Sequence, residues 1–462
     1  MTEVKEVVKT SRKYYPYSQY RDAEVECLDS IPSHWQAHAL KHALEIRITD
    51  GPHETPEFLD EGVPFVSAEA VAKGYIDFNK IRGYISVEDD KRFSRKYSPQ
   101  KHDVYMVKSG ATTGVTAIVE TEQHFNIWSP LAVMRCNQGF EPYYLLNYLR
   151  SRSFRESVEL NWSFGTQQNI GMGTLENLPI CHPPIDEQRT IAAFLDYETA
   201  RIDSLIDKQQ RLIELLKEKR QAVISHAVTK GLNPDAPMKD SGVEWLGQVP
   251  EHWDVCRLKH IATIQSGIAK GGKDLSGKAL ISVPMLRVAN VQDGFLKLDD
   301  IHTILIEEDM LNRYSLRDGD VLMNEGGDND KLGRGAIWRE QIPNCIHQNH
   351  VFAIRTAGVE PEWLDMLTRA SYAKFYFFSV AKQSTNLASI SASNIKETPI
   401  LVPPQNERFE ILEFLEKQLS RFDLLVQRCN NQIYLLKERR TALISAAVTG
   451  KIDLRNWSPS NA

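Results

Sequence analysis

The sequence lacks the features of a secreted, membrane-bound or cross-linked protein. Its six cysteines are dispersed over 462 residues without a Cys-x-x-Cys pair, which argues against a zinc ribbon and a disulfide framework. No run of about 18 apolar residues is present to span a membrane, and the first residues do not resemble a signal peptide. Because 42% of the residues are hydrophobic and 25% are charged, as in ordinary globular proteins, we expect a cytoplasmic protein without membrane contact.

Catalytic motifs are also scarce. Residues 267–274 nearly match a phosphate-binding loop, but Asp274 stands where Ser or Thr would hold magnesium, and its carboxylate would repel a nucleotide phosphate. His347 and His350 have no evident third partner for a metal ion. There is no Asn-Pro-Pro-Tyr segment of a methyltransferase and no strong nuclease constellation. We therefore predict no catalytic residue, no metal site and no cofactor in this chain.

Positive charge is not in excess either. The chain has 55 Lys and Arg against 61 Asp and Glu, with a net charge of −6, whereas DNA-binding surfaces are usually basic. A subunit that holds DNA only inside a larger assembly can still be acidic overall, provided that its basic residues lie on the binding face. Local basic clusters do occur, at Lys91-Arg92 with Arg95-Lys96 and at Lys270 with Lys273 and Lys278.

What the sequence does have is a long internal repeat. Three segments recur in the same order: residues 31–35 (IPSHW) and 249–253 (VPEHW), 182–187 (HPPIDE) and 402–407 (VPPQNE), and 216–225 (LKEKRQAVIS) and 436–445 (LKERRTALIS). A duplication of this length is not an accident of composition. The order is domain, helix, domain, helix, which allows an internal pseudo-twofold repeat. Such symmetry suits a target with two halves, such as double-stranded DNA.

The three repeated segments, which we call the frame, are kept while the loops between them differ. Residues 108–114 (KSGATTG) and 324–330 (NEGGDND) both follow a short apolar strand pattern, yet their chemistry is unrelated. The second loop offers carboxylates that could hold a cation, but the first loop has no acid. This pattern is expected if the frame docks on a symmetric partner while each domain reads something different.

Two long helices are predicted to follow Pro183-Pro184 and Pro403-Pro404. Asp186 and Asn406 are plausible N-caps, Gly231 and Gly450 supply the stops, and the first helix would be about 60 Å long at about 1.5 Å per residue. Apolar residues recur at steps of three and four or at sums of such steps, which is typical of a coiled coil. These positions are Ile191, Leu195, Ile202, Leu205, Leu212 and Leu216, and then Ile411, Leu415, Phe422, Leu425 and Leu436. We expect the helices to pair with each other in antiparallel fashion; the alternative is that each packs on its own domain.

The two globular domains are predicted to mix strands, helices and polar loops. Strand patterns lie at 63–67 and 103–106 and return at 281–286 and 320–323, while helical patterns lie at 142–149 and 361–367. Each domain also carries a polar segment, at 163–169 and at 383–387. Asn, Gln, Ser and Lys on such loops are side chains that read base edges in the major groove, although for any single residue the simpler interpretation is that it solvates a loop.

The frame resembles that of a known family. The Pro-x-His-Trp entries, the Pro-Pro-x-x-Glu helix starts, the Leu-Lys-Glu-(Lys/Arg)-Arg-x-Ala-(Val/Leu)-Ile-Ser helix ends and the linker 239–247 (KDSGVEWLG) are similar to those of the specificity subunit of type I restriction-modification systems. The resemblance covers about Arg21 to Asp453. It implies a mixed α+β (α/β) chain of two globular target recognition domains plus two long antiparallel coiled-coil helices.

The resemblance also implies a function. Each recognition domain reads one half of a split, asymmetric DNA target, and the helices set the spacing and dock two modification subunits, which restriction subunits then join. S-adenosylmethionine, ATP and Mg²⁺ would serve the adenine methylation and DNA cleavage of those partners, with no catalysis by this chain. The implied division is an N-terminal segment 1–30, recognition domains 31–182 and 249–402, spacer helices 183–232 and 403–452, a linker 233–248 and a tail 453–462.

Loop position and chemistry give the candidate DNA contacts. In the first domain they are His53, Lys108, Ser109, Thr112, Thr113, Gln167, Gln168 and Asn169, and in the second they are Lys270, Lys273, Asn324, Asn329, Lys331, Arg334, Gln383 and Asn386. Two other functions stay open at this point. A fused restriction and methylation enzyme would need catalytic motifs that are missing here, and a coiled-coil scaffold for proteins alone would not need two divergent polar-loop domains.

Overall fold

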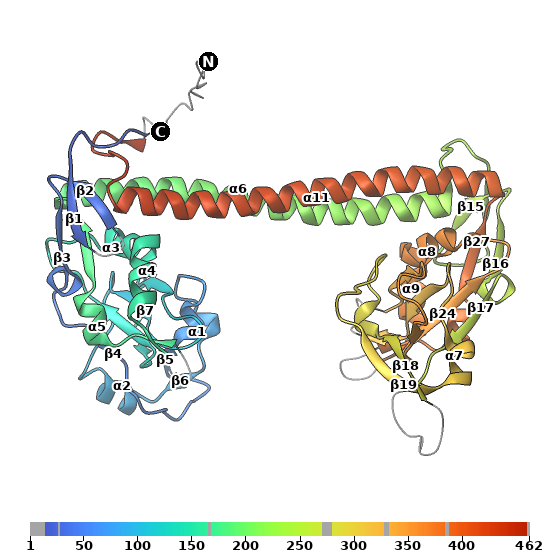
Figure 1. The fold of residues 1–462 in the computed structure, drawn as a ribbon, viewed down its shortest axis with the longest axis horizontal. Helices are drawn as coiled ribbons and strands as arrows, with labels where there is room; N and C mark the ends of the chain where they lie inside the picture. Colours follow the sequence, from blue (N-terminus) through green and yellow to red (C-terminus); the bar gives the residue numbers. More distant parts are fainter. Residues whose placement is uncertain are drawn as a thin grey trace, which may run out of the picture. The chain divides into compact units, whose positions relative to one another are not determined.

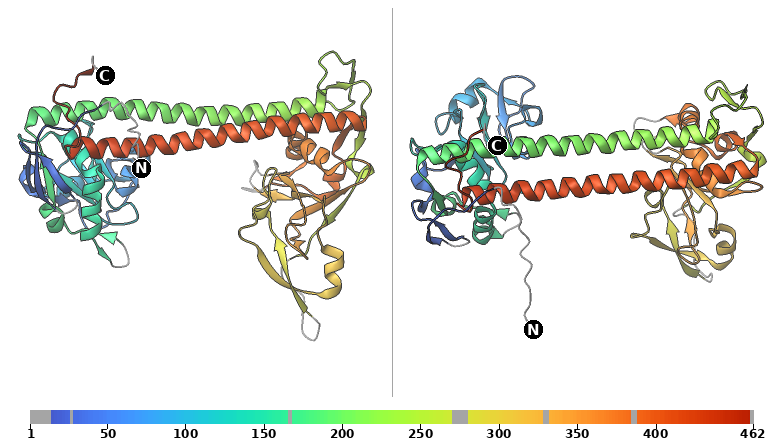
Figure 2. Two further views of the ribbon diagram at one scale, coloured as in Figure 1. Left: turned by 45° about the horizontal axis from the view of Figure 1, so that its top comes forward. Right: turned by 90° about the horizontal axis from the view of Figure 1, so that it is seen from above.

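Two helices far apart in the sequence, α6 (Ile185–Lys230) and α11 (Gln405–Val448), run side by side in the computed structural model (Figure 1, Figure 2). The structure describes residues 14–25, 28–164, 168–269, 280–327, 332–383 and 388–459. They fall into two compact units: unit 1 comprises Met1–Gln209 with Asn431–Ala462, and unit 2 comprises Gln210–Asn430. Each unit therefore contains one globular domain and one part of each long helix.

The long helices pair in antiparallel fashion, as predicted. In unit 1, Asp203 of α6 forms an ion pair with Arg440 of α11 at 3.2 Å. In unit 2, Arg220 of α6 pairs with Asp423 of α11. A step forward along α6 from the first pair to the second is matched by an equal step backward along α11. The two pairs are also copies of each other, because Arg220 and Arg440 occupy the same place in the repeat.

Each long helix ends as the sequence predicts but begins slightly earlier. Gly231 and Gly450 follow the helices with φ of 75° and 70°, the left-handed conformation that glycine adopts without strain. The prediction of Asp186 and Asn406 as N-caps is wrong, because α6 already includes Ile185 and α11 already includes Gln405. Asp186 lies instead in the first helical turn, where a carboxylate still faces the positive end of the helix dipole.

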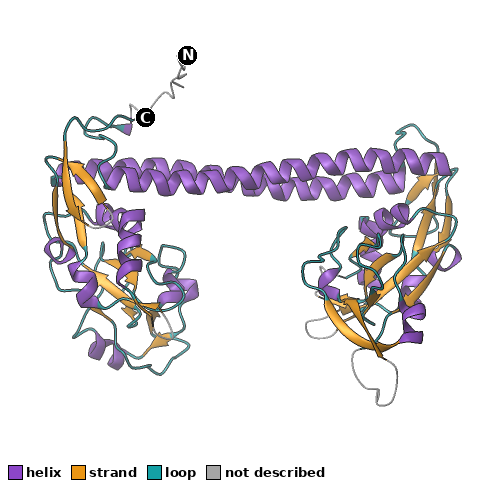
Figure 3. Cartoon of the chain, viewed as in Figure 1, coloured by secondary structure: helices purple, strands orange, loops and turns teal. Residues whose placement is uncertain are grey.

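Unit 1 builds its domain from short sheets (Figure 3). Its four-stranded antiparallel sheet has the order β4 (Thr49–Asp50), β10 (Leu131–Met134), β7 (Val104–Val107), β8 (Thr116–Ile118), and its three-stranded sheet has the order β6 (Tyr84–Ile85), β5 (Val63–Val66), β9 (Asn126–Ile127). Two-stranded pairs join β1 (Tyr20–Val25) to β2 (Leu28–Pro32), β3 (Gln36–Ala39) to β13 (Pro179–His182), and β11 (Ser163–Phe164) to β12 (Gln168–Asn169). The helices are α1 (Ala68–Val71), α2 (Val87–Phe93), α3 (Pro142–Arg150), α4 (Arg152–Asn161) and α5 (Met172–Asn177), with 3-10 turns at Leu40–Ala43 and Phe78–Lys80.

Unit 2 repeats this topology. Its four-stranded sheet is β17 (Ala262–Ser266), β24 (Val351–Thr356), β20 (Val321–Asn324), β22 (Gly335–Ile337), and its three-stranded sheet is β19 (His302–Glu307), β18 (Leu280–Leu286), β23 (Ile346–His347). The pairs are β14 (Met238–Asp240) with β15 (Gln248–Pro250) and β16 (Asp254–Arg257) with β27 (Pro399–Val402), while β25 (Lys382–Gln383) and β26 (Ala388–Ser389) are joined by β21 (Gly326–Gly327). The helices are α7 (Glu308–Tyr314), α8 (Pro361–Arg369), α9 (Ser371–Val380) and α10 (Ala392–Lys396), with 3-10 turns at Leu258–His260 and Val288–Asn290. The predicted mixed α+β fold with an internal repeat is thus confirmed.

The repeated sequence motifs meet in space at the start of each long helix. Glu187 of α6 accepts hydrogen bonds from Trp35 Nε1 at 3.1 Å and Tyr17 Oη at 2.6 Å, and it lies 2.9 Å from His34 Nε2. The first motif, Pro-x-His-Trp, is therefore tied to the second, Pro-Pro-x-x-Glu. This contact explains why both motifs return together in the repeat.

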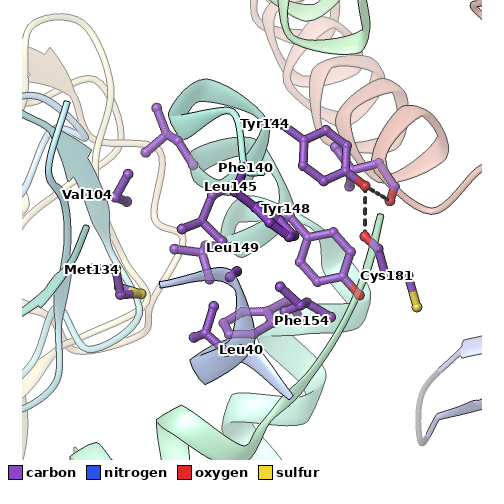
Figure 4. Packing of buried hydrophobic residues seen from close by; sticks show 14 of the residues in the cluster. Leu40, Val104, Met134, Phe140, Tyr144, Leu145, Tyr148, Leu149, Phe154 and Cys181 are labelled. Atoms are coloured by element: carbon purple, nitrogen blue, oxygen red, sulfur yellow. Dashed lines mark hydrogen bonds between the residues drawn. The ribbon is translucent and has the colours of Figure 1, made fainter. Parts of the chain in front are cut away.

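Each domain packs on the end of the helix that belongs to the other copy. In unit 1 the Tyr144 hydroxyl of α3 lies 2.8 Å from the carbonyl oxygen of Cys181 and 3.1 Å from that of Val448 in α11 (Figure 4). The same core buries Ile444 and Ala447 of α11 among domain residues. Unit 2 is built in the same way with the end of α6, including Ile224, Ala227 and Val228. The alternative prediction, in which each helix packs only on its own domain, is wrong.

Two equivalent serines mark these helix ends. The Ser445 hydroxyl of α11 accepts from the backbone N–H of Arg152 at 2.9 Å, at the start of α4. The Ser225 hydroxyl of α6 accepts from the backbone N–H of Ser371 at 2.8 Å, at the start of α9. Because the first N–H groups of a helix have no partner within it, each serine satisfies one of them and fixes the domain on the long helix.

Candidate nucleic-acid interface

In unit 1 the two predicted polar segments lie against each other. The loop after β7 contacts the β11–β12 hairpin, where Ser109 and Asn169 form a β-bridge and the Thr113 hydroxyl lies 3.3 Å from the carbonyl oxygen of Gln168. Gln168 and Asn169 are exposed, as is Ala111 in the loop, and the other residues of the loop 108–114 are half-buried. Segments separated by more than fifty positions therefore form one polar edge of the domain.

A buried carboxylate gathers cationic side chains at this same edge. Asp50 is fully buried, yet its Oδ2 lies 3.3 Å from Lys108 Nζ and 3.1 Å from His53 Nε2. Lys96 Nζ contacts the other carboxylate oxygen. Two lysines share one carboxylate, so the cluster keeps a net positive charge while its lysines are held in place. Held cations of this kind are suited to bind phosphates or base acceptors.

Unit 2 differs at the corresponding edge. Asn324, a predicted base contact, is only 2% exposed, and its side-chain amide donates to the carbonyl oxygens of Val288 at 3.3 Å and Val291 at 3.0 Å. An amide that is buried and occupied in this way cannot reach a base edge. Its assignment as a DNA contact is therefore withdrawn, because the side chain closes the core instead.

The residue next to Asn324 is acidic and half-buried. Glu325 follows β20 directly, and its Oε2 lies 2.7 Å from Nδ1 of His350. Gln383 is exposed on β25, and Arg334 is half-buried beside β22. Directly after β20 the second domain thus places a carboxylate beside an imidazole, where the first domain places Lys108 beside Asp50.

The remaining predicted contacts have varied outcomes. Thr112 is half-buried in the loop after β7. Six of the predicted contacts lie outside the described residues, namely Gln167, Lys270, Lys273, Asn329, Lys331 and Asn386.

Sequence reasoning did not assign Asp50 and Lys96 to the site, nor Glu325 and His350. For Asp50 a signal was present in the turn-rich segment 49–53, which has its counterpart at 265–269. A Cβ on Gly51 would lie 2.0 Å from the carbonyl oxygen of Ile127, and a Cβ on Gly267 would lie 2.0 Å from that of His347. Only glycine permits this close approach, and it brings the residue before it, Asp50 in unit 1, against the neighbouring sheet.

The known proteins whose sequences are similar to this chain belong to one family. The family model of the type I restriction modification DNA specificity domain matches residues 32–215. The type I restriction enzyme EcoKI specificity subunit of Escherichia coli is 22% identical over 409 residues, covering 87% of this chain and 85% of that protein. The MjaIX specificity subunit of Methanocaldococcus jannaschii is 22% identical over 443 residues, covering 92% and 95%.

A solved structure agrees with this assignment at the level of the fold. A chain from a study of complex assembly and conformational transition of the type I R-M system superposes with a TM-score of 0.66 at 16% identity, covering 91% of this chain and 99% of that chain. This chain belongs to the family of type I restriction-modification specificity subunits. Specificity subunits are the DNA-recognition components of their systems, and the relatives come from bacteria and archaea.

The predicted seam residues of this specificity subunit divide into two groups. Buried positions are Ile191, Leu195, Ile202, Leu216, Ile411, Leu415 and Phe422, and Leu436 is half-buried. In contrast, Leu205 is 47% exposed, Leu212 43% and Leu425 42%. The buried group packs within the two units, whereas the exposed group leaves large apolar side chains on the surface of the helices.

Two further observations concern metal binding and membrane spanning in the described residues. Within the residues that the structure describes, no three His, Cys, Asp or Glu side chains come together as metal ligands would. Over the same residues, neither α6 nor α11 nor any shorter helix combines the length and apolarity needed to cross a bilayer.

Proposed function

We propose that each domain of this specificity subunit reads one half of a split, asymmetric DNA target. The observation that carries the proposal is the contrast between the two polar edges. The sheets and helix contacts that build them are the same, but one edge holds Asp50 with two lysines and the other holds Glu325 with His350. A protein scaffold without DNA would not need two matching domains whose edges differ in this way.

The proposed recognition domains are residues 31–182 and 249–402, joined by spacer helices 183–232 and 403–452 and a linker 233–248, with a segment 1–30 and a tail 453–462 outside them. The proposed contacts with DNA in the described residues are His53, Lys108, Ser109, Thr112, Thr113, Gln168, Asn169, Arg334 and Gln383. These residues carry donors and acceptors that suit base edges and phosphates. Residues that read bases would change which sequence is methylated, whereas phosphate contacts would weaken binding uniformly.

The long helices would act as a ruler and as a docking surface. Because α6 and α11 run through both units, their length would set the distance between the two half-targets along the duplex. The exposed Leu205, Leu212 and Leu425 offer apolar contacts for two modification subunits, through which restriction subunits would join. S-adenosylmethionine, ATP and Mg²⁺ would be bound by those partners in the cytoplasm, and this chain would contribute recognition without catalysis.

The experiment that tests the proposal is genome-wide mapping of methylated adenines. The chain is co-expressed with its modification partner in a host without DNA methylation. A single split motif that disappears when the chain is omitted is the expected result. A stable complex that produces no methylation on any sequence would contradict the proposal and favour a scaffold for proteins alone.

A second test addresses the ruler. Residues inserted into the middle of both α6 and α11 should lengthen the unread gap between the half-targets without changing the bases read in either half, since about 34 Å corresponds to one turn of DNA. A methylation map that keeps its original gap would refute the role of the helices in spacing.

A further inference from the structure

Lys108 in unit 1 and Glu325 in unit 2 occupy the same position in the repeat. Lys108 follows the last residue of β7, and its N–H donates to the carbonyl oxygen of Pro130 at 2.8 Å. Glu325 follows the last residue of β20, and its N–H donates to the carbonyl oxygen of His350 at 2.9 Å. Both residues thus leave the central sheet in the same direction.

A second backbone hydrogen bond confirms the equivalence. The carbonyl oxygen of Lys108 accepts from the N–H of Ile170 at 2.9 Å, just after the β11–β12 hairpin. The carbonyl oxygen of Glu325 accepts from the N–H of Ile390 at 2.8 Å, just after the β25–β26 hairpin. With the backbone fixed on both sides by matching bonds, the two side chains begin from equivalent places, and only their chemistry differs.

The residues around Lys108 differ from those around Glu325, as the charges of the two side chains do. In unit 1 the Lys108 ammonium group is held by the buried Asp50, which Lys96 also contacts, so one positive charge is left over. At the place of Asp50, the residue before the close-approach glycine, unit 2 has Ser266. Glu325 has its partner in His350 instead. The partner of each side chain therefore differs together with its charge: a carboxylate for Lys108 and an imidazole for Glu325.

The two side chains recognise opposite hydrogen-bonding partners. A lysine ammonium group only donates, whereas an ionised glutamate only accepts. In the major groove, guanine presents two acceptors, O6 and N7, and lysine is a common partner for them, while the amino group of cytosine is a donor that a carboxylate accepts. Equivalent positions in equivalent domains would meet the same position of their half-targets.

We propose that Lys108 and Glu325 determine one base in each half of the target, guanine for the domain 31–182 and cytosine for the domain 249–402. Asp50 positions Lys108, and His350 positions Glu325. The proposal rests on the proposed function, because it requires that these edges face DNA. It adds the residues that make the target asymmetric and the class of base that each one reads.

The test is to map methylated adenines for variants in the assembled complex with the modification subunits. Lys108→Met removes the charge and keeps most of the side-chain length, and Glu325→Gln replaces one acceptor by a donor at constant shape. Each variant should relax or change a single base, in its own half of the motif only. Discrimination at that base should fall about tenfold or more. Lys101→Met, at an exposed lysine that pairs with Glu122 on the surface of unit 1, should leave the motif unchanged.

The outcomes separate this proposal from the one on which it rests. If the wild-type chain gives a split motif and both variants keep it intact, the assignment of these two residues is overturned while the proposed function stands. If the wild-type chain gives no motif at all, the proposed function fails first. A variant that lowers methylation equally on every sequence has lost a phosphate contact, and this result also overturns base reading by that residue. Should Lys108→Met fail to assemble because Asp50 loses a partner, Glu325→Gln decides the matter alone, since Glu325 is half-buried and lies at the surface.

Discussion

In both units a His and a Trp side chain contact a glutamate near the start of a long helix, and we call this contact the joint. The chain segments around the joint differ between the two units. In unit 2 the chain runs without interruption from α6 through a linker into the β14–β15 hairpin, and Glu407 contacts His252 and Trp253 at 2.7 and 3.0 Å. In unit 1 two segments from opposite ends of the chain meet at this place. The N–H of Asp453 donates to the carbonyl oxygen of Tyr15 at 2.7 Å.

The unit 1 joint carries additional contacts. Tyr17 adds a third partner to Glu187, and Trp457 packs edge-on against Phe194 of α6 with ring centroids 5.4 Å apart. A carboxylate on the helix and a Trp indole N–H on the domain are common to the joints of both units. Chain continuity is not required, because extra hydrogen bonds and aromatic contacts take its place.

Removing the carboxylate gives the largest expected difference between the units. Glu187→Ala leaves the Trp35 N–H and the Tyr17 hydroxyl buried without an acceptor, which should destabilise unit 1 by roughly 4 kcal/mol. Glu407→Ala, in the more exposed joint, should destabilise unit 2 by roughly 2 kcal/mol. Native-state hydrogen exchange, followed separately for peptides of each unit, measures both losses. Equal losses in the two units would show that the Tyr17 contact contributes nothing, and Glu214→Ala at an exposed ion pair provides the surface control.

The contacts of the C-terminal tail should contribute somewhat less to the stability of unit 1 than Glu187 does. Leu454 is buried in the core of unit 1, and Leu454→Ala should destabilise that unit by roughly 3 kcal/mol. Leu232 in the linker of unit 2 is exposed, so Leu232→Ala should change stability by less than about 0.5 kcal/mol. Thermal unfolding with unit-specific probes compares the two. A loss for Leu232→Ala as large as that for Leu454→Ala would mean that the linker is held as tightly as the tail.

The smallest expected effect concerns pH. Burial lowers the pKa of His38 and His182 on the paired strands β3 and β13 of unit 1, and burial likewise lowers the pKa of His347 in unit 2. The unfolded chain then binds protons that the folded units resist, so both units should lose stability as the pH falls below about 6.5.

Two of these imidazoles, one in each unit, can be exchanged for the residue that the other unit uses at the equivalent place. Val402 stands where unit 1 has His182, and Ile127 stands where unit 2 has His347. His182→Val should reduce the pH dependence of unit 1 alone, where His38 remains, and His347→Ile should flatten that of unit 2 alone. Unfolding measured at pH 5 and pH 7.5 tests this. An unchanged slope in the matching unit would rule out the buried imidazole as the source.

Much of the architecture could be predicted because it depends on local pattern and on the repeat. The strand patterns at 63–67 and 320–323 correspond to β5 and β20, and the helical patterns at 142–149 and 361–367 correspond to α3 and α8. The long helices follow from their apolar period and their terminal glycines. Their antiparallel pairing follows from the length of the seam in both copies.

The details of the site could not be predicted, because they depend on contacts between distant residues. Nothing local distinguishes Asn324, whose amide turns into the core, from an exposed loop asparagine. The ion pair of Asp50 with Lys96 joins residues that lie 46 positions apart, and Lys108 reaches the same carboxylate from still further along the chain. An apolar period also does not say which side remains uncovered, as the exposed Leu205 shows.

Because unit 1 includes residues from both ends of the chain, its order of assembly during synthesis is constrained. The ribosome completes unit 2 when residue 430 emerges, whereas unit 1 must wait for the final segment, 431–459, which carries Ile444, Ala447 and Val448 into its core. At about 5–20 residues per second, this delay after residue 209 lasts roughly 10 to 50 seconds. Of these two domains, the one that is translated first is therefore completed last. A truncated nascent chain would expose an incomplete core in unit 1 even though unit 2 had already formed.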